Sequence, residues 1–564
     1  MATGQASAGV ISLKDYDKLR GGFYTPAKIA EWLCSWAIRT PADTILEPSC
    51  GDGAFLSPAI SRLQKLGAAP EAITKQLLGI ELFPKEAEQS RLACASILPD
   101  SKEIIDCGDF FAWALKNEDS QYKCIIGNPP FIRYQNFPEP SRSLAMSIMK
   151  RVGLSPNKLT NIWVPFVVAS TRLLFPGGRL AFVLPAELLQ VSYSAQLRSF
   201  LVEQFECIDI IACNQMIFDR AEQEIVLFLA DGRKGKINES NHCLIDLWEA
   251  HSVEEILSSD PLSMDRKRER KIVNHDNEKW LKYFLTAKEI SLMRELRESM
   301  ATVELKVYGN VDVGVVTGRN EFFVLNKNEV RFYGIEAYTY PLIGRACQLK
   351  GSKIGQEEYL SLAEKGHRVF LFSSSSLENN GLSHEAKRYI TYGEERGFNK
   401  GYKCSIRFPW YSVPSIWNPD FFFFRQIYDF PRIVLNQIGA TSTDTIHRLI
   451  CNVDKNLFIS NFYTHLTAAS SEIEGRSYGG GVLELEPNEA ERLLLPSKLR
   501  NGLPADEIDK LVREGKLQNV LLENDKKILI DGLGLSKRDC QTLQNIWMRM
   551  RNRRQSRKKS RKTL

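Results

Sequence analysis

The sequence lacks the signatures of several large protein classes. Its twelve cysteines include no Cys-x-x-Cys pair and its seven histidines no His-Glu-x-x-His run, so neither a metal site nor a disulfide framework is indicated. No apolar run approaches the roughly 20 residues that a membrane-spanning helix needs. The N-terminus lacks the basic start and apolar centre of a secretory signal. We therefore expect a cytoplasmic protein with no membrane partner.

Positive charge is unevenly distributed along the chain. The net charge is +6, but the last sixteen residues, RMRNRRQSRKKSRKTL, carry nine Arg and Lys and no acid, so the rest sums to 6 − 9 = −3. We expect residues 501–564 to form a helical segment that ends in a basic, disordered tail suited to phosphates. A tail that only increases solubility would have the same composition.

Apolar runs alternate with helical patterns between about residues 40 and 230. This alternation predicts an α/β fold whose mostly parallel sheet is covered on both faces, with ligands at the carboxyl ends of the strands. Strands are expected at residues 44–48, 76–82, 103–110, 122–128, 177–185, 207–213 and 224–230, and helices at 161–175 and 193–206.

The 564 residues are enough for two or three domains. We expect a first domain over residues 1–245 and a charged connector over 246–304. Residues 305–500 are rich in aromatics, glycine and short apolar runs, as in VDVGVVTGRNEFFVL and NPDFFFFRQ, and predict a second, mixed α/β domain.

The first chemical motif is ILEPSCGDGAFL, which reads as a strand, an acid, a glycine-containing loop and a helix. Gly51 and Gly53 allow close approach of backbone to a ligand. Phe55 and Leu56 follow them, which departs from the GxGxxG pattern of dinucleotide-binding loops. An acid-tipped loop, with Glu47 at the strand end, suits a positively charged ligand better than a pyrophosphate.

The next two strands also end in acids. A carboxylate at Glu81 is placed to accept ribose hydroxyls. Asp109 and Phe110, in CGDFF, could bind the amino group and the face of an adenine. Each residue alone also fits a surface acid or a core phenylalanine, but acids at three successive strand ends describe one nucleoside-shaped ligand.

The fourth strand ends in GNPPF. Pro129 and Pro130 restrict the backbone, so Asn128 is held extended. The Asn128 side-chain oxygen and the Pro129 carbonyl offer two acceptors for the two hydrogens of an –NH2 group, and Phe131 offers a flat surface on which a base can stack. A proline-stiffened strand exit with a core phenylalanine is the simpler alternative.

These motifs together resemble the gamma-class, TaqI-like N6-adenine DNA methyltransferases of bacterial type II restriction-modification systems. GGFYTP (21–26), LEPSCGDGAF, GIEL, CGDFF and GNPPF occur in that family's order. The resemblance implies a Rossmann-like domain with a mixed seven-stranded sheet, and S-adenosylmethionine as cofactor. It places Thr25 and Glu47 near the methionine, Glu81 near the ribose, and Asp109 and Phe110 near the adenine. Ser49, Gly51, Gly53 and Leu82 complete the expected cofactor site.

The resemblance also implies the catalytic residues. A flipped-out adenine would lie against Asn128, Pro129, Pro130 and Phe131, and Phe218, in NQMIFDRAEQEIVLFL, matches the aromatic residue on the far face of the base. Phe131 replaces the family's usual tyrosine, so any hydroxyl contact is lost. The expected reaction is direct methyl transfer, in which positioning dominates and deprotonation follows transfer.

The second domain is expected to read the DNA sequence. VVTGRNEFFVL and EIEGRSYGGGVLEL resemble specificity segments of larger family members, and arginine is the commonest direct reader of guanine. Phosphate contacts and ion pairs are the commoner uses of an arginine. The GRSYGGG glycines fit either a close backbone approach or a structural turn. The candidates are Arg319, Arg345, Arg407 and Arg476.

Several alternatives remain open at this stage. The same NPPF chemistry serves enzymes that methylate rRNA, a protein amide or the N4 of cytosine in DNA. A fused restriction nuclease is disfavoured because only about twenty residues precede GGFYTP and no PD…ExK set follows. A non-catalytic DNA-binding module is disfavoured by the intact acids. The expected partners are double-stranded DNA and a separately encoded cognate restriction endonuclease, with the chain acting as a monomer.

Overall fold

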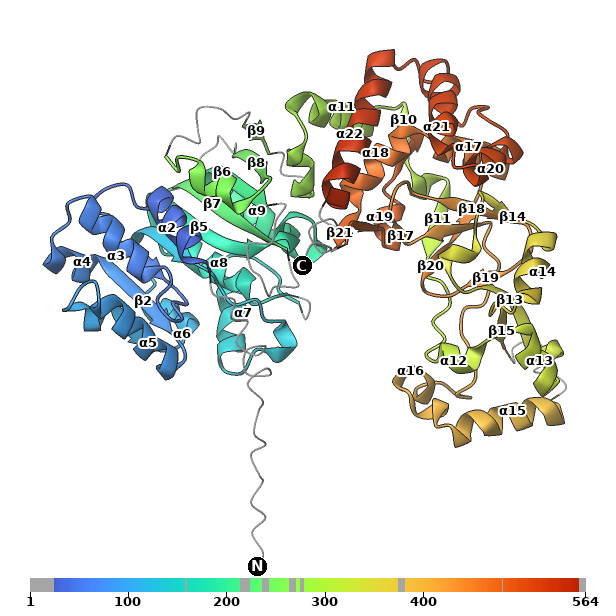
Figure 1. The fold of residues 1–564 in the computed structure, drawn as a ribbon, viewed down its shortest axis with the longest axis horizontal. Helices are drawn as coiled ribbons and strands as arrows, with labels where there is room; N and C mark the ends of the chain where they lie inside the picture. The colour runs from blue at the N-terminus through green and yellow to red at the C-terminus, as the bar shows by residue number, and fades with distance from the viewer. Residues whose placement is uncertain are drawn as a thin grey trace, which may run out of the picture. The chain divides into compact units, whose positions relative to one another are not determined.

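The computed structural model describes residues 25–157, 160–213, 224–235, 243–262, 270–273, 278–373, 381–478 and 480–556. The chain divides into two compact units, Met1–Ala287 and Lys288–Leu564 (Figure 1). The charged connector expected at 246–304 is shared between them, because its first part joins the sheet of the first unit and its last part, from Lys288, belongs to the second. In the described part of the chain, no helix is long and apolar enough to cross a bilayer.

A large sheet forms the centre of the first unit, and its described strands run in the order β3-β2-β1-β4-β5-β7-β6-β8-β9. Neighbouring strands from β3 to β5 are parallel, whereas β7 is antiparallel to both β5 and β6. The strands are β1 (Ile45–Glu47), β2 (Leu77–Glu81), β3 (Ile105–Cys107), β4 (Tyr122–Gly127), β5 (Leu174–Pro185), β6 (Phe205–Cys213), β7 (Ile225–Arg233), β8 (Leu244–Ala250) and β9 (Lys271–Ile272).

All seven expected strands are present, so the predicted α/β class and mixed sheet are confirmed, and β8 and β9 extend the sheet beyond the expected seven. Residues Asp246 and Glu249 made the β8 segment look like part of a charged connector. In the fold, β8 pairs along its whole length with β6, and Asp246 forms an ion pair of 3.8 Å with Lys271 of β9.

Helices cover both faces of this sheet. Cys124 and Ile126 of β4 pack with α2, α3, α5 and α10, while Ile125 between them is equally buried and points to the face of α8 and α9. Burial on both faces explains the continuous apolar runs in the sequence. The helices are α2 (Ala27–Ala37), α3 (Leu56–Lys65), α4 (Pro70–Gln76), α5 (Pro84–Ala95), α6 (Phe110–Lys116), α7 (Ser141–Arg151), α8 (Trp163–Arg172), α9 (Ala195–Gln204) and α10 (Val253–Ser258).

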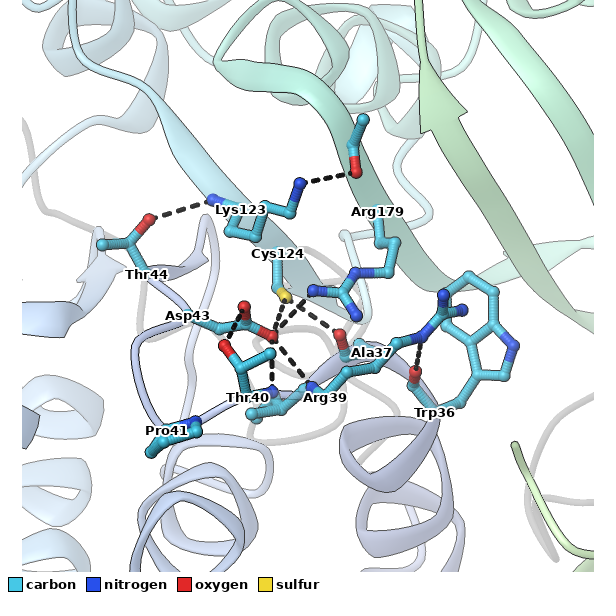
Figure 2. Close-up of polar contacts among 12 residues, drawn as sticks. Trp36, Ala37, Arg39, Thr40, Pro41, Asp43, Thr44, Lys123, Cys124 and Arg179 are labelled. Atoms are coloured by element: carbon cyan, nitrogen blue, oxygen red, sulfur yellow. Dashed lines mark hydrogen bonds and ion pairs between the residues drawn. The ribbon is translucent and has the colours of Figure 1, made fainter. Parts of the chain in front are cut away.

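A buried ion pair closes the amino edge of the sheet (Figure 2). The Asp43 carboxylate, just before β1, accepts hydrogen bonds from Arg179 of β5 at 2.7 Å, from the Arg39 N–H at 2.8 Å and from the Thr40 hydroxyl at 2.8 Å. The Cys124 thiol donates to the Ala37 carbonyl at 2.9 Å. Burial alone would raise the pKa of Asp43, but these donors outweigh it and lower the pKa.

The second unit contains several smaller sheets. Its largest described sheet runs β11-β20-β16-β18-β14, and a second runs β12-β15-β13-β19. Phe421 and Phe423 of β16 pack on one core and Phe422 and Phe424 on another, so FFFF is a strand buried on both faces. These strands are β11 (Gly309–Asp312), β12 (Val324–Leu325), β13 (Thr339–Ile343), β14 (Lys353–Ile354), β15 (Phe370–Phe372), β16 (Phe421–Phe424), β18 (Ile433–Asn436), β19 (Thr441–Ser442) and β20 (Ile446–Cys451).

Two shorter sheets are also present among the described residues of the second unit. Strand β10 pairs with β23, and β17, β22 and β21 form the other sheet. The GRSYGGG segment contains strand β21, and its last glycines, Gly480 and Gly481, lie before β22 with φ of 90° and 78°. These strands are β10 (Thr302–Glu304), β17 (Gln426–Ile427), β21 (Arg476–Tyr478), β22 (Val482–Glu484) and β23 (Leu494–Pro496).

The helices of the second unit end in one that corrects the prediction for the tail. Residues 549–556 lie in α22, where the disordered arm was expected to begin. The buried Arg554 guanidinium pairs with the buried Glu472 carboxylate at 2.7 Å and donates to the Gly481 carbonyl at 2.6 Å. A buried carboxylate needs a positive partner, and this pairing holds the segment in the fold. Residues 557–564 lie outside the described part.

The remaining bounds are α11 (Ala287–Glu298), α12 (Asn320–Phe323), α13 (Lys327–Tyr333), α14 (Gln356–Glu364), α15 (His384–Glu395), α16 (Tyr402–Ser405), α17 (Lys455–Phe462), α18 (His465–Glu474), α19 (Pro487–Ala490), α20 (Ala505–Arg513), α21 (Leu517–Asn524), a π-helical turn (Asp525–Ile530) and α22 (Lys537–Ser556).

Candidate active site

The predicted site residues of the first unit gather at the carboxyl edge of the sheet, because β1 to β4 are parallel neighbours. Glu47 and Glu81 are the last residues of β1 and β2, Asp109 follows β3, and Asn128 follows β4. Four strand ends therefore present polar side chains to one region. This is the edge where parallel α/β sheets bind ligands.

Glu47 is buried, and one of its carboxylate oxygens has no hydrogen-bond donor among the described residues. Its side chain is 1% exposed, and its Oε2 atom has no hydrogen-bond partner in the described part of the chain. Burial raises the pKa of Glu47 well above the ordinary carboxyl value, and the nearby Asp52 and Glu81 carboxylates raise it further, against a hydrogen bond from the Leu56 N–H. Such a group stabilises a ligand that brings a positive charge or an N–H donor.

Thr25 presents a second buried oxygen of the same kind, since its Oγ1 atom also has no partner among the described residues. Thr25 lies just before α2. Along α2, Cys34 donates to the Phe55 carbonyl and the Ile38 carbonyl accepts from Arg62, so α2 runs beside α3 toward the amino edge. The start of α2 is therefore on the carboxyl side of the sheet, toward Glu47.

The glycine loop after β1 is held by the end of β2. The Gly51 N–H donates to Glu81 Oε2 at 2.9 Å, and the Phe83 N–H donates to Glu81 Oε1 at 2.9 Å. Gly51 and Gly53 have φ of 54° and 90°, and a Cβ on Gly53 would lie 2.9 Å from the Ser90 hydroxyl. A carboxylate oxygen has two lone pairs, so a hydrogen bond from a backbone N–H does not by itself exclude one from a ligand hydroxyl. Leu82 is 40% exposed beside it.

Asp109 and Phe110 have structural contacts that the motif alone did not reveal. Asp109 caps α6, because its Oδ1 accepts from the Ala112 N–H at 2.8 Å, and its Oδ2 accepts from the Ser141 hydroxyl. Phe110 is buried and stacks on Phe166 with ring centroids 5.1 Å apart. Ser141 and Phe166 come from α7 and α8, and no local pattern pointed to them.

The end of β4 lies directly against Glu47. Gly127 has φ of 148°, and a Cβ built on it would lie 3.4 Å from Glu47 Cγ and 3.8 Å from Glu47 Oε1. The Ser49 hydroxyl donates to the Asn128 carbonyl at 3.4 Å, a weak contact that joins the two loops. Sequence reasoning missed Gly127, although the glycine before NPPF was the available signal.

The NPPF residues form the boundary between the strand and the surface. Pro129 is buried, whereas Asn128, Pro130 and Phe131 are half-buried. Phe131 packs partly against the core on the α2 and α3 face. The segment therefore has a core-facing and an accessible part. Phe218, the second aromatic residue expected for this site, lies outside the described residues.

The four arginines proposed as base readers in the second unit fall into two groups. Arg407 donates to the carbonyls of Val316 at 2.6 Å and Thr317 at 2.8 Å, and Arg476 pairs with Glu489 at 2.7 Å. Arg319 and Arg345 are exposed. Arg345 lines a cleft of about 440 Å³. The structure thus uses two of the four to hold the fold.

Two family models match separate parts of the chain. The Eco57I restriction-modification methylase model matches residues 61–218, which include the ends of β2, β3 and β4. The model of the C-terminal domain of the type II methyltransferase M.Eco57I matches residues 277–529, which make up most of the second unit.

Curated relatives and solved structures extend both matches. The chain is 25% identical to the type II methyltransferase M.AccI of Acinetobacter calcoaceticus over 89% of this chain and 90% of the relative. It is 23% identical to the type II methyltransferase M.XamI of Xanthomonas campestris pv. amaranthicola over 85% of each. A structure of the type IIL restriction-modification enzyme MmeI in complex with DNA covers 93% of this chain and 75% of its own, with a TM-score of 0.55 and 12% identity, which shows a shared fold.

Proposed function

We propose that this chain, which belongs to the type II restriction-modification methyltransferases, transfers a methyl group from S-adenosylmethionine to the N6 amino group of adenine in double-stranded DNA. Its relatives support DNA methyl transfer as the activity. The observation that carries the proposal is the contact between Glu47 and Gly127, which brings a buried carboxylate suited to a cationic cofactor against the strand end that positions Asn128.

The residues at the carboxyl edge fit this cofactor. Thr25 Oγ1 and Glu47 Oε2 are buried acceptors that would receive the ammonium of the methionine part, and Glu81 would receive the ribose hydroxyls. Asp109 and Phe110 would border the adenine, with Ser49, Gly51, Gly53 and Leu82 around them. Bound there, S-adenosylmethionine supplies an electrophilic methyl group on a positively charged sulfur. The excess of carboxylates at this edge favours that positive charge.

Asn128 and Pro129 position the acceptor in this proposal. The amide oxygen of Asn128 and the carbonyl of Pro129 would each accept one N–H of the target –NH2 group, which turns the nitrogen lone pair toward the methyl group. Phe131, with Pro130 beside it, would bear the face of a base flipped out of the duplex. Positioning and electrostatics then supply the acceleration. Phe218 remains the predicted contact on the other face.

The decisive experiment identifies the methylated nucleoside. The purified protein is incubated with duplex DNA and S-adenosylmethionine labelled in the methyl group, and the digested DNA is analysed by mass spectrometry. We expect N6-methyl-2′-deoxyadenosine from the wild type and a loss of about 10³-fold in rate for Asn128→Ala, with cofactor and DNA affinity retained. Label in N4-methyl-2′-deoxycytidine, or label transferred to ribosomal RNA but not to DNA in a parallel incubation, would refute the adenine assignment, and full activity in Asn128→Ala would refute the mechanism.

The biological setting follows from the same proposal. A type II methyltransferase protects DNA from a cognate restriction endonuclease, which we expect to be encoded separately. A monomer suffices, since one catalytic and one reading unit serve an asymmetric site. Sequencing methylated bases in DNA from cells that express the protein would give the recognition site.

A further inference from the structure

The second unit exposes a cluster of apolar side chains on a short loop. Phe408 is fully exposed, at 101% of its reference area, and Tyr402 and Ile406 are 74% and 63% exposed. All three belong to residues 396–409, which we call the α16 knuckle (Figure 1). Large apolar side chains that cluster in water raise the free energy of the folded state, so such a cluster indicates a contact surface.

The knuckle is held in place by the fold beneath it. The Arg407 guanidinium donates to the carbonyls of Val316 and Thr317, and Cys404 is buried. Gly318 has φ of 82°, and a Cβ there would lie 2.7 Å from Lys403 Cβ, so backbone passes close under the loop. Its exposed side chains therefore project from a preorganised support, which lowers the entropy lost when a partner binds.

Basic side chains accompany the exposed apolar ones. Residues 396–409 contain four basic residues and no acid. Of these, Arg396, Lys400 and Lys403 are exposed. The exposed Arg319 lies next to the knuckle, because a Cβ built on Gly401 would be 3.3 Å from Arg319 Nε. Two acids directly precede the knuckle: Glu394, which accepts a hydrogen bond from the Trp410 indole, and the exposed Glu395. Exposed apolar side chains on a segment whose own charges are all basic fit a polyanion that has flat apolar surfaces.

We propose that the α16 knuckle is a DNA-contacting surface of the second unit. Lys400, Lys403 and Arg319 contact phosphates, while Phe408 and Ile406 enter a groove and pack on sugars and base edges of double-stranded DNA. The inference rests on the proposed function and adds a specific contact surface to it. It also gives Arg407 a positioning role in place of the predicted base contact.

The experiment separates the charged contribution from the apolar one. Binding of the full chain to a labelled random-sequence DNA duplex is followed by fluorescence anisotropy over a series of salt concentrations. Lys400→Ala/Lys403→Ala should make the negative slope of log affinity against log salt concentration less steep by about 1.8. Phe408→Ala should weaken binding about tenfold and leave that slope unchanged. Cofactor affinity and melting temperature should stay at wild-type values.

Matched variants elsewhere in the second unit provide the controls. Phe332→Ala removes a phenylalanine that is 74% exposed on α13, and Lys365→Ala/Lys510→Ala removes two exposed lysines near α14 and on α20. These variants should bind as the wild type does. Equal losses in the controls, or unchanged binding by the knuckle variants, would overturn the inference while leaving the proposed function intact.

Two further outcomes would show that the proposed function itself is wrong, or that the knuckle binds a membrane and not DNA. If the wild type binds no duplex DNA, the proposed function fails and the inference fails with it. If the wild type binds vesicles of anionic phospholipid, and Phe408→Ala abolishes that binding without affecting DNA, the knuckle faces a membrane and the inference is wrong.

Discussion

Strand β1 has a buried acid at each end, with Asp43 just before it and Glu47 as its last residue. Asp43 accepts from Arg179, from the hydroxyl of Thr40 and from backbone N–H groups, and its pKa is lowered. Glu47 has a buried oxygen without a partner in the described part of the chain, and its pKa is raised. The same residue class, four positions apart, meets opposite environments.

The different environments of Asp43 and Glu47 suit different roles, one in stabilising the fold and the other in binding a ligand. A buried charge with its donors in place supports the fold, whereas an uncompensated one lowers the free energy of unfolding. The amino edge of the sheet therefore contains a finished structural ion pair (Figure 2). At the carboxyl edge, the Glu47 carboxylate lies near Asp52 and Glu81 and is not paired with a positive side chain in the described part of the chain, so a cationic ligand would stabilise it. Perturbed carboxylates of this kind gather at functional sites.

The largest effect is expected from breaking the compensated pair. Arg179→Leu leaves the Asp43 carboxylate buried without its guanidinium, so the free energy of unfolding should fall by about 3–5 kcal/mol. Urea denaturation measures it. Arg172→Leu is the control, because Arg172 forms only a partly exposed pair with Glu118 at 3.6 Å and should change stability by less than about 0.5 kcal/mol. Equal effects of the two changes would contradict the structural role of the Asp43 pair.

A smaller effect is expected where β4 meets Glu47. Gly127→Ala puts a strained φ at the strand end that carries Asn128, and its methyl group fills the space beside Glu47 in ordinary contact, so it should weaken binding of S-adenosylmethionine about tenfold and cost about 1–3 kcal/mol of stability. Gly67→Ala separates the two causes, since Gly67 has φ of 92° and no atom within 4 Å of an added Cβ. It should cost stability alone. Isothermal titration calorimetry of both variants measures the affinities, and unchanged affinity in Gly127→Ala would show that the contact is unimportant.

The smallest effect is a difference in pH dependence without cofactor. The raised pKa of Glu47 means that the folded state binds the proton more tightly, so wild-type stability is lost as pH rises from the ordinary carboxyl pKa toward the raised one. Glu47→Gln should remove this loss and gain about 1 kcal/mol at neutral pH. Asp43 has the opposite sign, since its stabilisation is present above the ordinary pKa and lost in acid.

Thermal melting across pH checks both signs. Asp43→Asn should remove part of the acid sensitivity and lower stability at neutral pH. If Glu47→Gln is less stable than the wild type at neutral pH without cofactor, the uncompensated state assigned to Glu47 is wrong.

Much of the first unit could be predicted because its signals are local. The part of a strand that is buried on both faces must be apolar, so residues 124–127 and 225–230 stood out as apolar runs within the expected strands 122–128 and 224–230. The acids Glu47 and Glu81 stood out because a charge at the end of such a run needs a reason. Strand β8 was missed because Asp246, paired with Lys271 of β9, made it resemble a charged loop.

The features that could not be predicted depend on distant partners. Arg554 looked like part of a free tail, but it meets Glu472, 82 residues away in the sequence. Arg407 looked like a base reader, but it holds the carbonyls of Val316 and Thr317, about 90 residues away. The Asp109 side chain also meets a distant partner, because it accepts a hydrogen bond from the Ser141 hydroxyl, 32 residues away in the sequence.

The most direct test of the central claim is the melting temperature of the wild type and Glu47→Gln, each with and without S-adenosylmethionine. Without cofactor, Glu47→Gln should melt above the wild type, because it lacks the buried uncompensated charge. With saturating cofactor the order should reverse, because ligand binding stabilises only the form that binds it, by about 2.7 kcal/mol at a concentration 100 times Kd. A cofactor-induced rise of equal size in both proteins would contradict the assignment of Glu47 as the acid that binds the cofactor.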